Sequence, residues 1–583
     1  MRKILCFALV VLLLAGIFVS CKNPIEEIAQ HKTVVKTENY TVNSAMMSYF
    51  FMDYYNQTYQ YYLESCRQYG LTSGMSQQEI HIYVCQMMGF DGLKPLKEQY
   101  MDHDNSITAF DYYLNLTKER VLLILTCCEL ALDYGITLED RDHKEIDAAI
   151  EEIKINYEIK KQMGQMPYSS FGKYLNETYG NGVDENVIRD CHEMTTLAAK
   201  AEEKLYDEIH ATVLDQEGHA WIEQYVKENP SSFLLADYYL YTFSVKSIDC
   251  ESEAEFEVAQ RKLLEEAKAL AAGDAQNYKE TVMELLRQTE HEEYYNKNWD
   301  KYLDQAENDE VAATQKLNED FEWEAIKEAK YTMLLNVGYQ APSDPNELSK
   351  WIFGFDGGEH EASRDAAVQG DIAYFEQTDT RVETVQTGTG DKKEAVTTYT
   401  ISVYLLDRAA YRNQEITKRI GWAMFSEKED AEKFYEAYSK LQVKNKDTMM
   451  DLLGEFSEEL FVFSCGAYED YKMGDMERQH IKGVDQWIKN AKSGDVSKVL
   501  EIEQESVTGN TNVSKTLYTV VVFDGDGYEY WFAKALAGAT NEQVSEWFEK
   551  NTIQAEFDEH TGTYIRDPYN ARTFTYGEAI PQP

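Results

Sequence analysis

Three short stretches decide the fold: Asp485-Gln-Trp487-Ile488, Gly494-Asp495-Val496 and Tyr518-Thr519-Val520. The same elements stand earlier, in the same order and with different spacers, as Ser349-Lys-Trp351-Ile352, Gly370-Asp371-Ile372 and Tyr399-Thr400-Ile401. Each copy is preceded by an aromatic strand candidate and by helical sequence rich in Ala, Glu and Lys. Two modules of one βα-type fold, the first with a long helical insertion, would explain this repeat. Chance similarity of aromatic strands is the alternative.

Strands are predicted where β-branched and aromatic residues cluster, at residues 233–245, 397–406, 420–425 and 517–523. The Asp524-Gly525-Asp526-Gly527 sequence predicts a hairpin turn after the last of them. Residues 253–335 have a helical pattern, and a loop is predicted at 338–345 because it contains two prolines. Residues 427–441 predict the helix that follows the third strand.

The segment from Asn43 to Asn229 is predicted to be helical throughout, because apolar residues recur at helical spacing and prolines are rare. Asn43 or Ser44 can cap the first helix, and Gly135 and Gly180 are expected to end later ones. The predicted later helices are 108–134, one that starts at Thr137, 169–179 and 185–210. The expected fold class is therefore α+β, with an all-helical N-terminal domain before the two mixed modules.

The N-terminus has the pattern of an exported protein. Arg2 and Lys3 precede an apolar run at residues 4–19, which is too short to span a bilayer comfortably. The run ends Phe18-Val19-Ser20-Cys21, which resembles the lipobox of bacterial lipoproteins, although Phe18 stands where Leu is usual. The resemblance implies lipidation of Cys21 and a location on the outer face of the cell membrane. An uncleaved signal anchor is the alternative.

These features predict six segments along the chain. They are a signal peptide (1–20), a lipid-anchored tether (21–42), a helical chaperone-like domain (43–230), a first module (231–408), a second module (409–550) and an irregular tail (551–583).

Composition excludes several function classes. Asp and Glu number 103 against 56 Lys and Arg, a formal charge of −47, and nucleic-acid binding needs a basic surface instead. The nine cysteines include no CxxC pair, which argues against a disulfide framework and a zinc site and favours buried thiols. No zinc-protease, phosphate-loop or nucleophile-elbow motif is present, so no metal or cofactor is expected.

Two regions resemble one family. Residues 169–189, which contain Tyr174-Leu175, Tyr179-Gly180, Asp184 and Arg189 and lead to Leu197-Ala-Ala-Lys200, look like the helical chaperone region of the SurA and PrsA foldases. Asn43 and the aromatic helix after it resemble the opening helix of that region. The two repeat modules resemble parvulin (PpiC-type) prolyl isomerase domains, which are small antiparallel sheets wrapped by helices.

In the second module the parvulin resemblance follows the order of short motifs. Arg419-Ile420-Gly421-Trp422 stands where the family has its first strand, and Gly466-Ala-Tyr468-Glu469 and Gly474-Asp-Met476 stand at its glycine loop and substrate side. Gly494-Asp495-Val496 and Tyr518-Thr519-Val520 then match the turn and the last strand.

The catalytic residues of that family are missing. Parvulins carry two histidines on adjacent strands, whereas the second module has Gly421 and Thr519 at these positions. The first module has Thr400 at the second position and no histidine in its first strand. The uncatalysed barrier to prolyl rotation is about 18–20 kcal/mol, and we expect no centre here that lowers it.

A peptide-binding surface is the property that the resemblance leaves in place. Residues predicted to hold a client polypeptide are Tyr54, Tyr55, Tyr59 and Tyr62 in the first helix and Trp422, Phe425, Tyr468 and Met476 in the second module. Tyrosine gives a large contact area at low entropy cost. The alternative for each tyrosine is an ordinary place in the core or rim of a helical domain.

The sequence therefore predicts a foldase-like lipoprotein that binds unfolded or folding exported polypeptides, without cofactors and without isomerase turnover. An active peptidylprolyl isomerase and a non-enzymatic surface-binding protein are the two alternatives. The sequence leaves the oligomeric state open.

Overall fold

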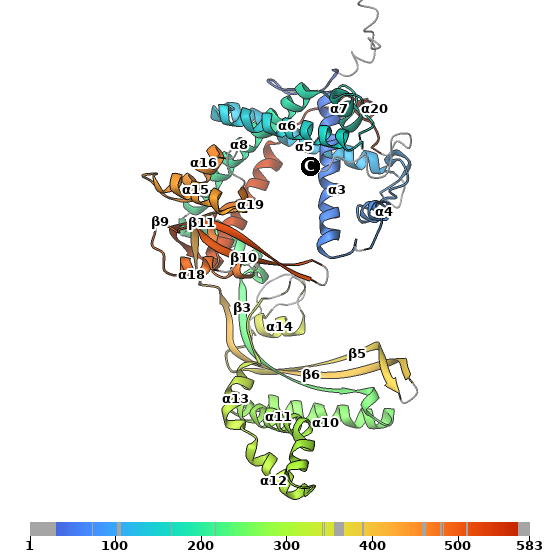
Figure 1. Ribbon diagram of the computed structural model, residues 1–583, viewed down its shortest axis with the longest axis vertical. Coiled ribbons are helices and arrows are strands. Elements are labelled where there is room, and N and C mark those ends of the chain that lie inside the picture. The colour runs from blue at the N-terminus through green and yellow to red at the C-terminus, as the bar shows by residue number, and fades with distance from the viewer. Residues whose placement is uncertain are drawn as a thin grey trace, which may run out of the picture. The chain divides into compact units, whose positions relative to one another are not determined.

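The computed structural model describes residues 31–568 except 73, 102–105, 165, 216, 341, 343, 345, 355–365, 388–389, 457–461, 479–480, 482 and 509–510. It contains both helices and strands, which confirms the α+β class (Figure 1). None of the helices in these described segments is long and apolar enough to cross a membrane. The predicted signal peptide and Cys21 lie outside the described residues.

The chain divides into two compact units. The helical unit contains Met1–Thr212 and Thr540–Pro583, and the sheet unit contains Val213–Ala539. Both unit boundaries fall inside helices, namely α8 (Glu185–Asp215) and α19 (Tyr530–Asn551). The module starts predicted at residues 231 and 409 lie inside the sheet unit, shortly before the first strand of each of its two sheets.

The helical unit begins with a β-hairpin made of β1 (Thr33–Lys36) and β2 (Thr41–Asn43). The prediction of an irregular tether up to residue 42 is therefore wrong for these residues, because Val34, Val35 and Val42 are buried in the core. The helices that follow are α3 (Ser44–Gln68), α4 (Gln77–Met87), η1 (Leu96–Glu98), α5 (Ala109–Tyr134), α6 (Asp140–Gln162), α7 (Phe171–Tyr179) and α8.

Capping residues set most of these helix ends as predicted. The Asn43 side chain accepts hydrogen bonds from the backbone N–H groups of Ala45 and Met46. Gly135 ends α5 in the left-handed conformation, with φ of 64°. The third helix starts later than predicted, because Glu139 and not Thr137 is its N-cap residue and forms a capping box with Asp142.

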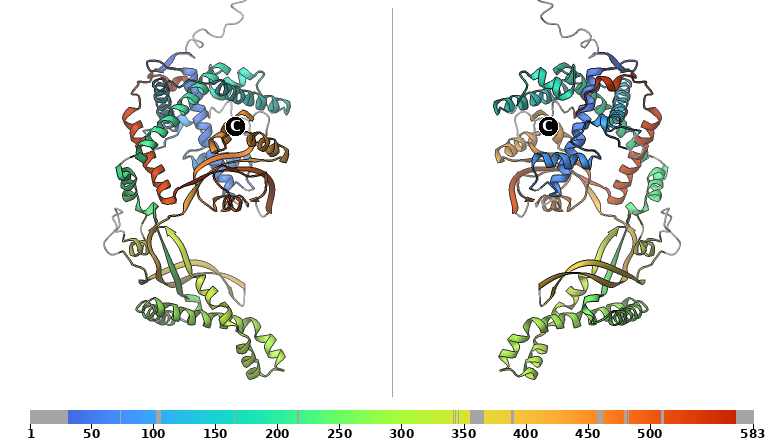
Figure 2. Two further views of the ribbon diagram at one scale, coloured as in Figure 1. Left: turned by 90° about the vertical axis from the view of Figure 1, so that its left-hand side faces the viewer. Right: turned by 90° about the vertical axis from the view of Figure 1, so that its right-hand side faces the viewer.

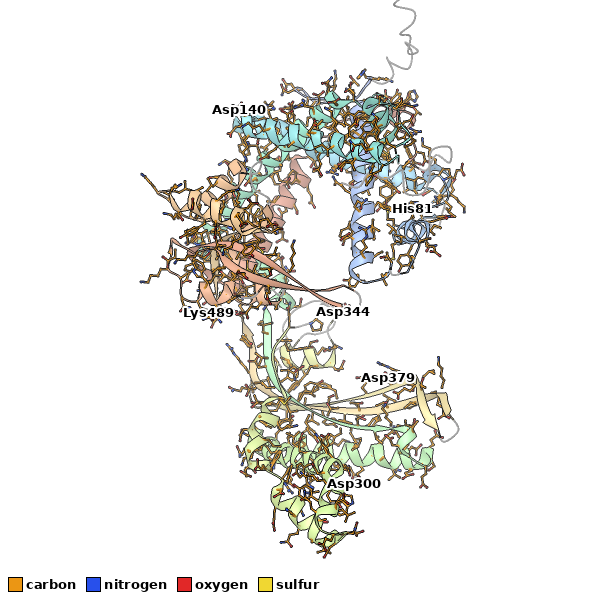
Figure 3. All side chains as sticks on the ribbon, viewed as in Figure 1. His81, Asp140, Asp300, Asp344, Asp379 and Lys489 are labelled. Atoms are coloured by element: carbon orange, nitrogen blue, oxygen red, sulfur yellow. The ribbon has the colours of Figure 1, made fainter. Side chains whose placement is uncertain are left out.

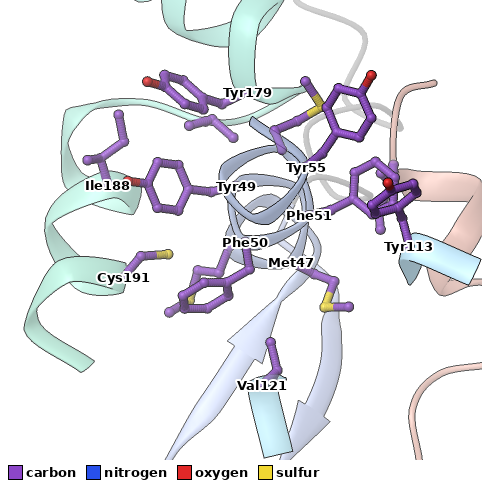
Figure 4. Packing of buried hydrophobic residues seen from close by; sticks show 14 of the residues in the cluster. Met47, Tyr49, Phe50, Phe51, Tyr55, Tyr113, Val121, Tyr179, Ile188 and Cys191 are labelled. Atoms are coloured by element: carbon purple, nitrogen blue, oxygen red, sulfur yellow. The ribbon is translucent and has the colours of Figure 1, made fainter. Parts of the chain in front are cut away.

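Helix α3 is the centre of the helical unit's core. Its first half is buried on all sides, since α5, α7 and α8 surround it. Figure 4 shows side chains of α3 directed towards Tyr113 and Val121 on one side and towards Ile188 and Cys191 on the other. The first half of α3 thus buries aromatic side chains on several faces, whereas Tyr61 in its second half is 69% exposed.

The C-terminal segment packs back onto this core. The tail predicted to be irregular after Asn551 contains a short helix, α20 (Thr561–Tyr564), and a buried Ile565. Phe548 and Phe557 pack against the same core cluster. The backbone N–H of Asp558 donates to the carbonyl of Val34 at 2.8 Å.

The sheet unit opens with η2 (Glu217–His219), α9 (Ala220–Glu228) and η3 (Pro230–Ser232). Its first sheet has the strands β3 (Leu234–Lys246), β4 (Leu335–Gln340), β5 (Ile372–Thr387) and β6 (Gly390–Arg412), in the antiparallel order β4-β3-β6-β5. Between β3 and β4 lie η4 (Ser247–Asp249), α10 (Glu253–Ala271), α11 (Ala275–Gln305), α12 (Glu310–Asp320) and α13 (Trp323–Thr332), and α14 (Glu347–Phe353) precedes β5. Figure 2 shows this sheet in green and yellow as strongly twisted.

The second sheet has the strands β7 (Ile416–Phe425), β8 (Val462–Tyr471), β9 (Asp495–Val496), β10 (Leu500–Thr508) and β11 (Thr511–Glu529). Their order is β10-β11-β7-β8, with β9 also paired to β11. Helices α15 (Lys428–Ser439) and α16 (Lys446–Phe456) connect β7 to β8, and α17 (Asp475–Arg478) and α18 (Val484–Ile488) connect β8 to β9.

The two sheets share one topology. In each, the first and last strands of the sequence are the central pair; the outer strands are β4 and β5 in the first sheet and β8 and β10 in the second. In each, the longer helices pack on one face of the central pair and a short helix, α14 or α18, packs on the other. The repeated Trp-Ile sequence of the two copies is this short helix.

The repeated Gly-Asp sequence forms the same turn twice. Gly370 and Gly494 have φ of 92° and 86°. Their N–H groups donate to carbonyl oxygens of the last strand, at Leu406 and Phe523, and each of the two hydrogen bonds is 2.8 Å long. The following aspartates accept the backbone N–H three residues earlier, at 2.9 Å for Asp371 and 2.8 Å for Asp495. Positive φ explains the glycine in both copies.

Two turn predictions are wrong. Asp524–Gly527 does not form a hairpin turn, because β11 continues to Glu529 with irregular register on both sides of Gly525. A Cβ on Gly527 would lie 2.8 Å from the carbonyl oxygen of Glu469. Glycine at this position therefore allows the chain to pass close to the Glu469 backbone. The loop predicted from Gly338 starts later, since β4 extends to Gln340.

Candidate functional site

The predicted client-binding residues of the second module lie on a sheet that has two covered faces. Trp422 lies on the face covered by α17 and α18, and its ring stacks on that of Tyr468 with centroids 6.3 Å apart. Trp422 and Met476 are 7% and 4% exposed, whereas Tyr468 is 39% exposed. Phe425 lies on the opposite face, fully buried against Phe434. Of these four residues only Tyr468 offers substantial surface to a client, so the prediction is wrong for the other three in this conformation.

The two positions assigned to the histidine pair do not face each other. β7 and β11 are neighbours, as the resemblance requires, but Gly421 pairs with Val522 and Thr519 pairs with Met424. Because paired residues share a face and neighbours along a strand alternate, Gly421 and Thr519 lie on opposite faces. Side chains at these two positions could not meet.

The threonines of the two modules occupy comparable places. Thr519 is fully buried and donates its hydroxyl to the carbonyl of Ala423 at 2.9 Å. Thr400 lies on the central strand β6, on the face that carries α14. No strand in the described part of the chain carries a histidine.

A buried polar cluster fixes the short-helix face of the second sheet. Asp485, which is 1% exposed, accepts hydrogen bonds from the Tyr471 hydroxyl at 2.7 Å and the Gly474 N–H at 3.0 Å. The Tyr471 hydroxyl accepts the Met476 N–H at 3.2 Å. Burial, with the hydrogen bond to Asp485 second, raises the pKa of Tyr471 well above its usual value. The cluster positions the loop before α17 and is structural.

The predicted groove of tyrosines on α3 is also largely core. Tyr55 and Tyr59 are 2% and 5% exposed, and Tyr54 and Tyr62 are half-buried against the same cluster. The Tyr59 hydroxyl lies 3.2 Å from Nδ1 of the buried His81, which Figure 3 labels in this unit. Tyr55 and Tyr59 therefore cannot form a client surface in this conformation, because neighbouring helices cover them.

A pocket of about 460 Å³ opens instead on another side of α3. Its lining is mostly apolar area with a few polar groups, contributed by α3, α6, α7 and α8. Three aromatic rings, Tyr49, Tyr174 and Tyr179, line it together with amide and acidic side chains. A concave, largely apolar site with a few polar groups is the usual form of a ligand pocket. We call it the helical-unit pocket.

Asp53 is the charged centre of the helical-unit pocket. It accepts a hydrogen bond from the Gln57 side chain at 2.9 Å, and a guanidinium nitrogen of Arg120 lies 3.7 Å away. Burial raises the pKa of Asp53, which Arg120 counteracts only in part. Gln60 contributes a buried amide nitrogen that has no hydrogen-bond partner among the residues that the structure describes. The pocket thus holds donor capacity that the folded chain leaves unused.

His192 completes the polar side of this pocket. Its Nε2 lies 3.1 Å from the Tyr49 hydroxyl. Burial lowers the pKa of His192, with Asp53 acting in the opposite direction, and burial raises the pKa of Tyr49. Both groups are thereby kept neutral near pH 7. A neutral histidine and a neutral tyrosine can each donate and accept hydrogen bonds with amide groups.

Sequence reasoning missed this pocket because its residues come from helices far apart in the chain. One signal was present: Asp53 interrupts the apolar run Phe50-Phe51-Met52-Asp53-Tyr54-Tyr55. A carboxylate inside such a run has to be paired or to face a cavity.

Cysteines and metals contribute no site in the described residues. Cys66, Cys85, Cys127, Cys128 and Cys191 are buried thiols, as predicted for most of the cysteines. Over the described segments, no group of three or more His, Cys, Asp or Glu side chains is placed to hold a metal ion.

No protein-family model, curated protein or solved structure matches this chain. Its function therefore has to be inferred from its own residues and geometry.

Proposed function

We propose that this protein is an extracytoplasmic, lipid-anchored chaperone of the foldase type, which holds unfolded polypeptides reversibly and has no prolyl isomerase activity. Cys21 would carry the anchor, and the clients would be exported polypeptides. Holding and release need neither ATP nor a covalent step. Weak, reversible binding prevents aggregation while the client folds.

The observation that carries the proposal is the order of elements in the two sheets. Each runs from a strand through longer helices, a second strand, a short helix, a Gly-Asp turn and an outer strand to the closing strand. This is the order of the parvulin domains that the sequence resembles. The helical unit before them has the capped helices and the Tyr179-Gly180 break of the chaperone resemblance.

The absence of isomerase chemistry is supported by the central strands. The described strands carry no histidine, and the two equivalent positions, Gly421 and Thr519, lie on opposite faces. A substrate at either face would meet apolar residues or the buried Asp485 cluster rather than a pair of imidazoles.

The helical-unit pocket supports the polypeptide-binding part of the proposal. Its tyrosine rings can pack against apolar side chains of a client, and its amides can pair with peptide N–H and C=O groups. Because tyrosine and amide groups are not specific for one sequence, such a site suits many clients. An active isomerase and a surface-binding protein remain the alternative functions, and the tests below separate them.

The first test measures suppression of aggregation when a chemically unfolded protein is diluted into residues 22–583, with a prolyl isomerase assay on the same sample. Suppression at near-stoichiometric ratios without turnover is expected. Turnover would favour the active isomerase. If neither activity appears and one folded partner binds selectively, the surface-binding alternative takes its place.

A pair of variants on α6 tests the pocket itself. Ala149 lines the helical-unit pocket, so Ala149→Trp fills part of it, whereas the neighbouring Ala148 is exposed and does not line it. Ala149→Trp is expected to weaken suppression at least several-fold, and Ala148→Trp is expected to leave it unchanged. Equal suppression by both variants would remove the pocket from the client-binding surface.

A further inference from the structure

A second pocket, of about 560 Å³, lies within the sheet unit beside the first sheet. Its floor is one face of that sheet, where Leu235 pairs with both Gln340 and Tyr411. Tyr530, Trp531 and Lys534 from the first turns of α19 form its wall. We call it the cationic pocket because Arg408, Lys472 and Lys534 line it.

Three cations line this pocket without a carboxylate partner. No carboxylate among the described residues lies within ion-pair distance of Arg408, Lys472 or Lys534. This is unusual in a chain with 103 Asp and Glu against 56 Lys and Arg, in which nearby cations such as Arg412 and Lys418 are paired. Glu415 is the single carboxylate in the lining, and it is exposed.

Aromatic rings hold these cations in place. Arg408 lies over the Tyr411 ring at 3.5 Å from its centroid, and Lys472 lies over the Tyr530 ring at 4.8 Å. Lys534 lies 5.7 Å from the Phe233 centroid and donates to the carbonyl of Ser232 at 3.1 Å. A cation held by a ring keeps its charge unneutralised and loses less side-chain entropy when an anion binds.

The nearby carboxylate of Asp237 does not neutralise these cations. The carboxylate of Asp237 is occupied, because it accepts the Tyr411 hydroxyl at 2.9 Å and the Gly338 N–H at 2.7 Å. Gln340, Asn413 and Gln414, which carry amide side chains, also line the pocket. Such amides can pair with the backbone of a bound peptide.

We propose that the cationic pocket binds an acidic peptide segment, with neighbouring Asp or Glu carboxylates paired to Arg408 and Lys472. Guanidinium binds carboxylate in a bidentate way, and the ammonium groups add point charges. The protein's charge of −47 repels acidic segments elsewhere, so this pocket is where such a segment can be held. This assignment names one class of client segment and rests on the proposed function.

The test is a titration of residues 22–583 with a blocked acidic hexapeptide and with its Asn/Gln counterpart, followed by isothermal calorimetry. Preferential binding of the acidic peptide that weakens with rising salt is expected. Arg408→Gln with Lys472→Gln should weaken it at least tenfold. Lys498→Gln, which removes an exposed positive charge elsewhere in the unit, should leave it unchanged.

Several outcomes would overturn the assignment. Equal affinity for the neutral peptide would do so, as would unchanged binding in the double variant whose circular dichroism matches that of the parent. Inorganic phosphate that binds as tightly as the acidic peptide and displaces it would identify a phosphate site instead. Loss of aggregation suppression with retained acidic-peptide binding would count against the proposed function but not against this pocket.

Discussion

At the residue scale, the Tyr179-Gly180 break has a packing cause. Gly180 has φ of 113°, and a Cβ there would collide with the Ser48 hydroxyl on the central helix α3. Glycine therefore allows the end of α7 to approach α3 directly. The sequence predicted the helix end at this position but not the contact, because Ser48 lies far away in the chain.

Gly180→Ala is expected to destabilise the helical unit by about 2–4 kcal/mol, since both the backbone conformation and the space are lost. Gly172→Ala in the same helix is the matched control, because its Cβ would meet nothing within 4 Å. That change should be neutral or stabilise by about 0.5–1 kcal/mol. Urea unfolding of the full chain measures both, and equal effects would contradict the packing account.

Asp53 predicts a pH dependence of stability. Its folded-state pKa is raised above the ordinary 3.8, chiefly by burial, so the folded state binds the proton more tightly than the unfolded state. The free energy of unfolding should therefore fall as pH rises from 3.8 through the raised pKa of Asp53. Asp53→Asn should abolish this loss in a pH series of urea unfolding curves.

Asp142 should show the opposite sign and is the control. Burial raises its pKa, but hydrogen bonds from Lys200, at 2.6 Å, and from the Glu139 N–H outweigh burial and lower it. Its contribution is present above 3.8 and is lost as pH falls through the lowered pKa. A parallel pH series should be measured on Asp142→Asn. If this substitution altered the free energy of unfolding over the same pH range as Asp53→Asn, the assignment would be contradicted.

At the element scale, the repeated Trp-Ile pair marks equivalent positions in the two modules, but the sequence did not show what anchors them. In the second sheet the pair lies in α18, and Asp485 in the same helix is buried and bonded to Tyr471. Asp485→Ala is expected to cost about 2–4 kcal/mol, because it leaves the Tyr471 hydroxyl and the Gly474 N–H without their partner. Thermal unfolding should show this loss.

The exposed Asp495 provides the comparison for Asp485. It accepts one backbone hydrogen bond, from Lys492, so Asp495→Ala should cost no more than about 1 kcal/mol. A smaller loss for Asp485→Ala than for Asp495→Ala would mean that the buried cluster does not stabilise the second sheet.

Strand prediction succeeded where apolar and β-branched residues were dense and failed where glycines were taken as turns. β3, β6, β7 and β11 coincide with the predicted strands, although three of them extend further. Gly525 and Gly527 indicate a turn by local statistics, but tertiary contacts keep both residues within strand β11. A Cβ on Gly525 would lie 3.0 Å from an Arg419 nitrogen on β7, and no local pattern contains that information.

At the scale of the whole molecule, sequence reasoning treated the C-terminal segment as a tail, whereas it belongs to the N-terminal core. Ile565 is 2% exposed, and the Asp567 carboxylate accepts the backbone N–H groups of Leu96 and Lys97 at 3.2 and 2.9 Å. The two partners are separated by more than four hundred residues, so no sequence period could reveal the contact. The helical-unit pocket escaped prediction for the same reason.

A chain that ends at Asn551 should therefore unfold at a lower temperature than a chain that ends at Pro568, with a loss of several kcal/mol in the helical unit. Both chains lack residues 569–583, so the comparison isolates residues 552–568. Differential scanning calorimetry is the measurement. Identical transitions would show that this segment does not stabilise the core.

The proposed holding of unfolded polypeptides is tested most directly by a comparison of two forms of one client. Fluorescence anisotropy would measure the affinity of residues 22–583 for a protein kept unfolded by reduction and alkylation, and for the same protein in its native state. We expect binding to the unfolded form at least tenfold tighter than to the folded form. Equal affinity, or binding to the folded form alone, would contradict the chaperone account.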